Sequence, residues 1–301
     1  MKRLGAGLLM TLLTFPSMAQ KATDQNTLLW KISGKGLKAP SYLFGTIHML
    51  CKDDATLSDS LKRVIRQSDE VYFEVDLDNM IEMLSVISKM KMRGDTTLQD
   101  LLSEADYEKV KTYFESKGSV LPFAMLETYK PILAASMLQG KPTACETTAM
   151  MEQVIMQEAS SHSKKIRGLE TMGYQAEILD GIPYKLQAQQ LVEYVDAAVK
   201  GEGESKELSE MMQAYREQDL QKLEQMMLKD EAGIAAYAEL LLYGRNRNWV
   251  EKLKDILPQK SVLIAVGAGH LPGTQGVIAL LRKAGYTVSP VENKVNTSRE
   301  I

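Results

Sequence analysis

The stretch YLFGTIH at residues 42–48 joins an apolar run to a Gly-x-x-His frame, and VLIAVGAGH at residues 262–270 repeats the arrangement near the other end of the chain. Each apolar run predicts a buried strand. Gly45 and Gly267 allow the backbone to turn sharply where the strand ends. The frames contain His48 and His270, two of the three histidines in 301 residues. This pairing predicts that the two ends of the chain meet at one place.

The wider pattern predicts one central sheet. Residues 28–32 and 42–44 flank the turn residues Gly34-Lys35-Gly36 and predict a hairpin. Further strands are expected at residues 70–76, 166–169, 262–266 and 286–288, and helices at 57–67 and 277–283. Most of residues 77–257 has helical spacing of apolar residues. We therefore expect an α/β fold, with a central sheet closed by the N- and C-terminal segments and a large α-helical insertion at about 77–257.

Polar side chains follow several of the expected strands. His48, His270 and Glu74 stand at or near strand ends, and Glu170 follows the expected strand at 166–169. In open α/β sheets, ligands bind beyond the carboxyl ends of the strands. Two neutral imidazoles and a carboxylate suit a catalytic zinc, manganese or iron site with one position open for water. His48, Glu74 and His270 are thus candidate metal ligands, and Glu170 or Asp76 a candidate general base.

Simpler roles stay open for the same residues. Glu74 could form a partly buried salt bridge, and Glu170 could cap a helix starting near Met172. Arg245 could clamp a substrate carboxylate or stabilise an oxyanion, or it could belong to the polar start of a solvated helix. His162, between serines, is expected to be a packed or surface residue rather than a ligand. The sequence has no His-Glu-x-x-His motif, so any metal site must be assembled from distant segments.

The N-terminal residues 1–19 resemble a secretory signal peptide. Lys2 and Arg3 precede an apolar segment at residues 8–15, and small residues precede a cleavage site near Ala19. We expect the remaining chain, residues 20–301, to be exported to the periplasm or the exterior as one domain with its helical insertion. In an oxidising compartment, Cys51 and Cys145 could form a disulfide or remain buried thiols.

Composition and motifs exclude several classes. The net charge is −3, from 36 Lys and Arg against 39 Asp and Glu, which argues against a nucleic-acid partner. No later apolar stretch is long enough to span a membrane. A phosphate-binding Gly-x-x-x-x-Gly-Lys-Ser/Thr loop and a Gly-x-Ser-x-Gly esterase elbow are both absent.

Several segments together resemble the TraB/GumN family, which is similar to the TIKI proteins and more distantly to the erythromycin-esterase (EreA) and ChaN-like groups. In chain order they are Leu43–His48, Val71–Asp76, Gly168–Thr171, Arg245–Trp249 and Val266–Gly273. The resemblance covers residues 28 to 290 and implies an EreA/ChaN-like α/β core with a helical insertion.

The TIKI relatives are regarded as metal-dependent proteases. By resemblance, His48 and His270 would hold a divalent ion (manganese, cobalt or zinc) with Glu74. Glu170 would act as base or orient a ligand, and Arg245 would stabilise developing negative charge. The main hypothesis is therefore an exported metal-dependent hydrolase acting on a peptide or small molecule. The alternatives are a haem- or metal-binding protein without catalysis and a metal-independent esterase with His48 as general base.

Overall fold

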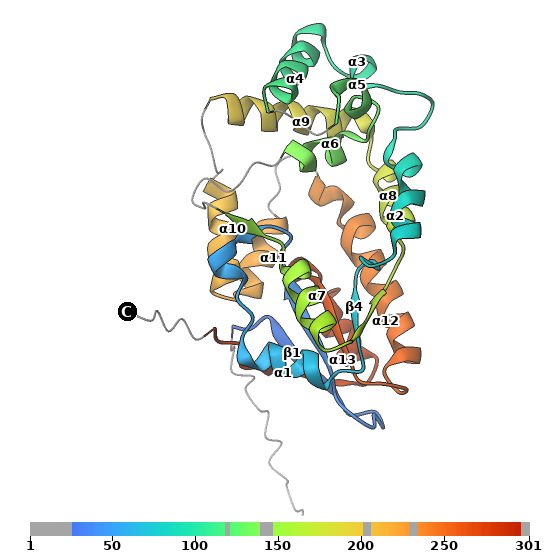
Figure 1. Ribbon diagram of the computed structural model, residues 1–301, viewed down its shortest axis with the longest axis vertical. Coiled ribbons are helices and arrows are strands. Elements are labelled where there is room, and N and C mark those ends of the chain that lie inside the picture. The colour runs from blue at the N-terminus through green and yellow to red at the C-terminus, as the bar shows by residue number, and fades with distance from the viewer. Residues whose placement is uncertain (1–25, 118–120, 139–146, 201–205, 229–233, 296–301) are drawn as a thin grey trace, which may run out of the picture.

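The structure, a computed structural model, describes residues 26–117, 121–138, 147–200, 206–228 and 234–295 (Figure 1). Within these ranges the chain forms a six-stranded sheet, a two-stranded sheet and 13 α-helices. The larger sheet has the strand order β6-β4-β7-β2-β1-β8. Its strands are β1 Leu29–Ser33, β2 Ser41–Thr46, β4 Glu70–Phe73, β6 Lys165–Gly168, β7 Val262–Gly267 and β8 Thr287–Val291. The mixed α/β class with a central sheet is confirmed.

Strands from both ends of the chain pair in this sheet. β1 and β2 form the predicted hairpin, with Trp30 opposite Leu43. β2 runs parallel to β7, and Thr46 is the register partner of Gly267. β4 lies parallel between β7 and β6. The segments that follow β2, β4, β6 and β7 therefore leave the sheet at the same edge.

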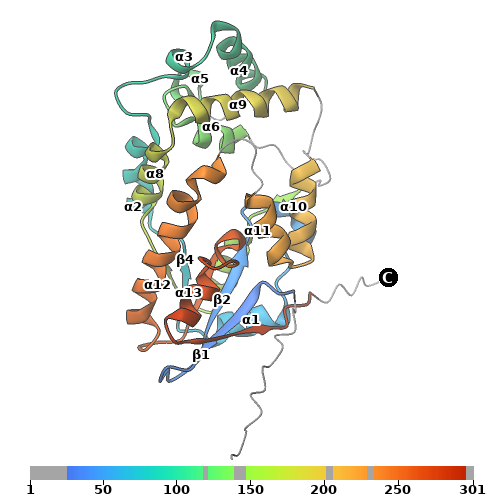
Figure 2. The same ribbon diagram turned by 180° about the vertical axis from the view of Figure 1, so that it is seen from behind.

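Helices cover both faces of the sheet (Figures 1 and 2). One face carries α1 (Asp59–Gln67) and α7 (Met151–Ser161), and the other carries α12 (Gly244–Ile256) and α13 (Val277–Lys283). In α1 the Ser58 hydroxyl caps the helix by accepting the Leu61 N–H at 3.0 Å. Leu61, Val64 and Ile65 of the same helix are buried. This spacing places one apolar stripe toward the sheet.

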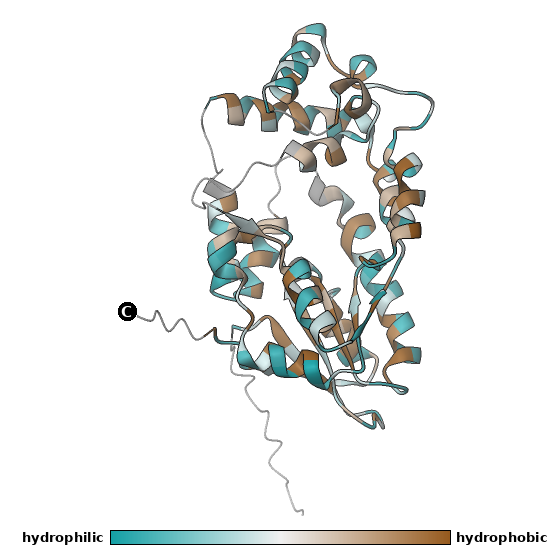
Figure 3. Ribbon diagram, in the orientation of Figure 1, coloured by the Kyte–Doolittle hydropathy of each residue, from teal (hydrophilic) through white to brown (hydrophobic). Residues whose placement is uncertain are grey.

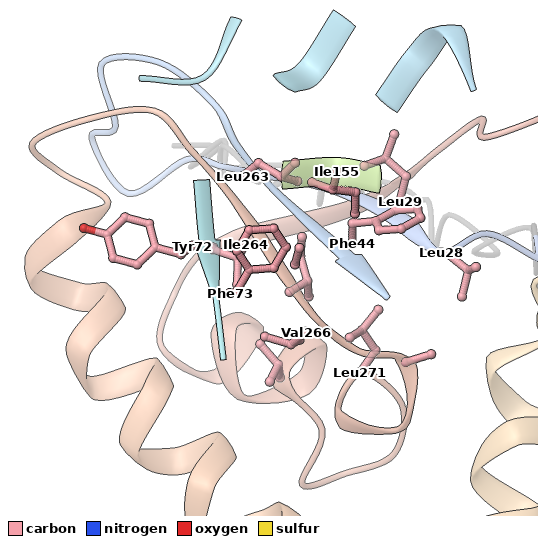
Figure 4. Close-up of a cluster of buried hydrophobic side chains, with 14 of the residues drawn as sticks. Leu28, Leu29, Phe44, Tyr72, Phe73, Ile155, Leu263, Ile264, Val266 and Leu271 are labelled. Atoms are coloured by element: carbon pink, nitrogen blue, oxygen red, sulfur yellow. The ribbon is translucent and has the colours of Figure 1, made fainter. Parts of the chain in front are cut away.

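The main core lies between the sheet and these helices. Leu263, Ile264 and Val266 of β7 are fully buried and belong to one core with Phe44 and Phe73 from the neighbouring strands (Figure 4). A continuous apolar run is typical of a parallel strand that is covered on both faces. β7 is therefore the centre of the core.

A second set of helices forms a lobe with its own core (Figure 1). It contains α3 (Leu98–Leu101), α4 (Glu104–Ser116), α5 (Phe123–Leu126), α6 (Pro131–Leu138) and α9 (Tyr184–Val199). Brown and teal residues alternate along these helices, as expected for amphipathic helices (Figure 3). Phe114, Leu126 and Leu191 are among the buried residues of the lobe. β6 lies within residues 77–257 but belongs to the central sheet, so this range is not helical throughout. The division of the chain at about 77 and 257 stays a prediction.

The remaining helices surround the strand ends. They are α2 (Met80–Val86), α8 (Met172–Ile178), α10 (Lys206–Arg216) and α11 (Leu220–Leu228). α2 follows β4 and α8 follows β6, and both lie between the sheet and the lobe in Figure 1. The carboxyl ends of these strands therefore face the lobe.

Two elements differ from the sequence predictions. The strand expected at residues 70–76 ends at Phe73, because the chain then turns, with the Asp76 carboxylate accepting the Asp78 N–H at 3.2 Å. All four residues of β4 are buried, so the polar residues form the strand's end rather than one face. Arg245 stands in the first turn of α12, but it is buried rather than part of a solvated helix start.

Cys51 is disulfide-bonded, and Cys145, the other cysteine of the chain, lies outside the described residues. Cys51 belongs to β3 (Leu50–Cys51), which pairs with β5 (Thr148–Ala149). The predicted signal peptide, residues 1–19, also lies outside the described residues. Among the described helices, none combines the length and the apolar character needed to cross a bilayer.

Removing a side chain from the centre of the sheet should destabilise the protein strongly. Ile264→Ala leaves a cavity in β7 and is expected to lower the free energy of unfolding by about 2–5 kcal/mol. The control Ile81→Ala truncates a side chain that is 82% exposed and should change it by less than about 0.5 kcal/mol. Denaturant unfolding measures both. Equal effects would contradict the central position of β7.

Candidate functional site

The two Gly-x-x-His frames lie side by side because their glycines allow close approach. A Cβ atom on Gly45 would lie 3.1 Å from the Cα of Ala268, in the neighbouring frame. A Cβ atom on Gly267 would lie 3.2 Å from Oε1 of Glu74. Larger residues at these positions would push the strand ends apart. The frame glycines thus bring His48, His270 and Glu74 to one edge of the sheet.

His270 is buried and held from both sides of its ring. After β7 the chain makes a short 3₁₀ turn, Ala268–His270. The Nδ1–H of His270 donates to Oδ1 of Asn246 at 2.6 Å, since Nδ2 of Asn246 donates to carbonyl oxygens. Nε2 of His270 therefore accepts, and Arg245 donates to it at 3.2 Å. The Trp249 ring packs against His270 with centroids 4.5 Å apart.

Arg245 is the central cation of the site. It extends from α12 and is 7% exposed. One terminal nitrogen lies 2.5 Å from Oε2 of Glu74 and 2.5 Å from Oε1 of Glu170. The other donates to the Leu241 carbonyl and to His270, and Nε donates to Glu170. Every nitrogen of this guanidinium is therefore engaged within the protein.

Further donors complete the hydrogen bonding of the Glu74 and Glu170 carboxylates. The Gln175 side chain, from α8, donates to Glu74 at 3.0 Å and to Glu170 at 2.9 Å. The Gly267 N–H donates to Oε1 of Glu74 at 2.9 Å. The Trp249 indole donates to the second oxygen of Glu170 at 2.9 Å. Both carboxylates are therefore fixed in position, and the arrangement of Glu170 suits an orienting role better than that of a free base.

His48 differs from His270 in its surroundings. Its side chain is 74% exposed, and Nδ1 lies 2.9 Å from Oε1 of Glu152. The Thr46 hydroxyl donates to the same oxygen at 2.7 Å. Thr46 belongs to the Gly-x-x-His frame itself, so one frame and the start of α7 form a single hydrogen-bonded unit.

The charges of the site shift its pKa values in opposite directions. Burial lowers the pKa of His270 to about 4, despite the raising effect of Glu74. Burial alone would raise the pKa of Glu74, but the charges of His270 and Arg245 outweigh it and lower the value to about 2. The hydrogen bond to Glu152 raises the pKa of His48. At neutral pH the site contains a neutral His270 and ionised Glu74.

The structure brings the five predicted site residues to one edge: Arg245 links Glu74, Glu170 and His270, and His48 pairs with Glu152. Their roles as ligands or catalysts stay predictions. Glu170 does not cap α8; the Thr171 side chain does so by accepting the Tyr174 N–H at 3.0 Å. His162 lies on the surface beside Glu158, 3.3 Å away.

Sequence reasoning missed three partners of these residues. They are Asn246, Gln175 and Glu152. Asn246 follows Arg245 in the sequence, and this position next to a candidate site residue is the only sequence feature that points to it. Gln175 and Glu152 carry no motif, because their contacts arise from the packing of α8 and α7 against the sheet edge.

The donor types fit a divalent ion in part. Nε2 of His270 and Oε1 of Glu74 lie 3.8 Å apart. Two atoms bound to one ion at about 2.0–2.2 Å can be no more than about 4.4 Å apart, so this pair is suitably spaced. Within the described ranges, no set of three or more His, Cys, Asp and Glu side chains is arranged to hold an ion. His48 would have to turn toward the pair to supply a third donor.

Replacing Arg245 should leave two buried carboxylates without their cation. Arg245→Gln is expected to lower the free energy of unfolding by about 3–5 kcal/mol at neutral pH. Arg247 lies two positions after Arg245 in α12 and forms an exposed ion pair with Glu239. The control Arg247→Gln should lower the free energy of unfolding by less than about 1 kcal/mol. Denaturant unfolding of both variants tests the expectation. Similar losses would show that the buried cluster has no special role.

The neutral state of His270 predicts a pH dependence. The pKa of His270 in the folded protein, about 4, lies below the ordinary value of 6.5. Between these two values, His270 is protonated in the unfolded chain but neutral in the folded protein. Stability is therefore full above about pH 6.5 and falls toward pH 4, by up to about 3 kcal/mol. His270→Gln should lack this component. A stability difference between the two proteins that does not shrink as the pH falls would contradict the assignment.

The sequence of this chain is similar to those of several known proteins. The model of the TraB/PrgY/gumN family matches residues 28–290. Similar curated proteins include "Metalloprotease TIKI2" of Danio rerio, 23% identical over 315 residues, and "Metalloprotease TIKI1" of Homo sapiens, 23% identical over 316 residues. Each alignment covers 88% of this chain. It covers 61% of the first relative and 62% of the second, so the chain spans about three fifths of their length.

No solved structure matches the chain, so the EreA/ChaN-like form of the core stays a prediction. The family match covers nearly the whole described chain, from the start of β1 to the last strand, and includes both Gly-x-x-His frames. The protein therefore belongs to the TraB/PrgY/gumN family.

Proposed function

We propose that this protein is an exported metal-dependent hydrolase that cleaves an amide or peptide bond. The main support for the proposal is that Nδ1 of each frame histidine is held by a side-chain oxygen. In His48 and in His270 a side-chain oxygen holds Nδ1, at 2.9 and 2.6 Å, which directs Nε2 of each ring toward an ion; at His270 the ion would displace the hydrogen bond that Arg245 donates to Nε2. Histidines that bind metals typically donate their other N–H in this way.

The proposed ligands are His270, Glu74 and His48. The spacing of the first two supports a shared ion, and His48 lies at the end of the adjacent parallel strand. A bound divalent ion would supply a water of lowered pKa and would polarise a substrate carbonyl. The low pKa values of His270 and Glu74 keep both donors free of protons at neutral pH, as a ligand must be.

The main role of Arg245 and Glu170 would then be to position the metal ligands. Arg245 neutralises much of the charge of Glu74 and Glu170, which lowers the net negative charge around a bound ion. Glu170 fixes Arg245 and Trp249, and Trp249 packs on the His270 ring. In the proposed mechanism this buried group keeps the donor pair rigid, and a substrate would have to approach from the exposed side of His48.

The relatives and the cysteine chemistry support the class and the compartment. The curated relatives carry the name metalloprotease, at about 23% identity. Cys51 is disulfide-bonded, which suits an oxidising compartment and the signal-like residues at the N-terminus. The metal and the substrate within the peptide or small-molecule class are part of the proposal.

A second candidate is a hydrolase that needs no metal. It is favoured by the exposure of His48 and by the hydrogen bond that orients its ring against Glu152. Such a pair could activate a water as general base. Activity that survives complete chelation would support this candidate over the first. Binding of haem without catalysis stays a prediction, which a haemin titration of wild type and the histidine variants can test.

The proposal predicts a bound metal and activity that depends on both frame histidines. The protein as exported should contain a divalent ion and hydrolyse members of a peptide library. His48→Ala and His270→Ala should lower kcat/KM at least about a hundredfold, because each loses a ligand of the centre. The control His162→Ala removes the surface histidine and should behave as wild type. Metal analysis and peptide assays measure both properties. Metal-free wild type with behaviour unaltered in both variants would end the proposal.

A further inference from the structure

Glu152 is a buried carboxylate whose only described side-chain partners are residues of the first Gly-x-x-His frame. It is 5% exposed and lies in the first turn of α7. Its Oε1 accepts from Thr46 at 2.7 Å and lies 2.9 Å from Nδ1 of His48. The N-terminus of a helix stabilises a negative charge, and the His48 ring and the Thr46 hydroxyl lie against the same carboxylate.

The second oxygen of Glu152 points to a role other than stability. Oε2 is buried and has no hydrogen-bond partner among the described residues. An unsatisfied buried oxygen of a charged group destabilises a fold. The side-chain contacts of this carboxylate therefore run through Oε1, to the Thr46 hydroxyl and to the His48 ring.

The same arrangement occurs at the second frame with a different residue. Asn246, on α12, holds Nδ1 of His270 through its side-chain oxygen. Glu152, on α7, holds Nδ1 of His48. The two helices lie on opposite faces of the sheet (Figures 1 and 2). Each face thus provides one oxygen that orients one imidazole.

The chain near Glu152 is tied to the chain after His48. Leu50 and Cys51 pair with Ala149 and Thr148 in the small sheet. The Lys52 N–H also donates to the Thr147 carbonyl at 3.0 Å. This pairing fixes the start of α7 beside the first frame and holds Glu152 at its distance from His48.

We propose that Glu152 is the positioning residue for His48: it holds Nδ1 in the protonated form and so presents Nε2 to the site. The inference rests on the proposed function for the work that His48 does there. Thr46 fixes the same oxygen and keeps it aimed at the ring. A residue outside every motif of the sequence thereby sets the orientation of the exposed histidine.

The tautomer of His48 tests this without metal or substrate. Imidazole ¹⁵N NMR of the metal-free protein can assign its three histidines from single His→Gln variants, at a pH high enough to keep the rings neutral. Wild type should show His48 with the proton on Nδ1. Glu152→Ala should move a large part of the population to Nε2–H, while Glu152→Gln, whose amide oxygen can still accept, should retain Nδ1–H. His270, held by Asn246, should not change.

The control is Glu158→Ala, which removes the partner of His162 on the same helix and should leave His48 unaltered. An unchanged His48 tautomer in Glu152→Ala would overturn the inference. A thermal midpoint of Glu152→Gln equal to or above that of wild type would support positioning over a structural role. A large fall in that midpoint, with the tautomer retained in both variants, would overturn it.

Manganese binding separates this inference from the proposed function. In a titration with Mn²⁺ alone, Glu152→Ala should weaken binding about 10- to 100-fold, and Glu152→Gln should weaken it less. Wild type that binds none of Mn²⁺, Co²⁺ and Zn²⁺ in such titrations, with a tautomer change in Glu152→Ala, would remove the metal proposal and leave the positioning role supported. Wild-type affinity retained in Glu152→Ala would count against the role.

Discussion

The parallel pairing of β2 with β7 is the constraint on which the site depends. It joins a strand near the start of the chain to one near its end, and it sets Thr46 opposite Gly267. This register places the two Gly-x-x-His frames side by side at the end of the two strands. Because parallel strands leave a sheet at the same edge, each later residue of the site needs only a short loop or a helix start to reach it.

A buried charge cluster stabilises what this pairing brings together. Arg245 joins Glu74, after β4, to Glu170, after β6, and it also contacts His270 after β7. One cation thereby links the ends of three strands to α12. A buried cation with two carboxylates stabilises a fold only when its geometry is nearly ideal, so the many donors around Glu74 and Glu170 are part of the arrangement.

Much of this could be predicted from the sequence, for physical reasons. The apolar run at 262–266 is typical of a parallel strand that is covered on both faces, and a Gly-x-x-His frame after such a run places its histidine at the strand end. Glu152 and Gln175 could not be found this way, because tertiary packing alone brings them to His48 and Glu74. The early end of β4 was missed because alternation in sequence continues beyond the last paired residue.

In the proposed site, the frames from opposite ends of the chain surround one metal centre. Anomalous diffraction from crystals of the protein grown with Mn²⁺ can locate this ion. We expect a single strong peak within bonding distance of Nε2 of His270 and Oε1 of Glu74, with the His48 ring turned toward it. Manganese bound elsewhere, or no peak while Arg245 keeps its contact with His270, would contradict it.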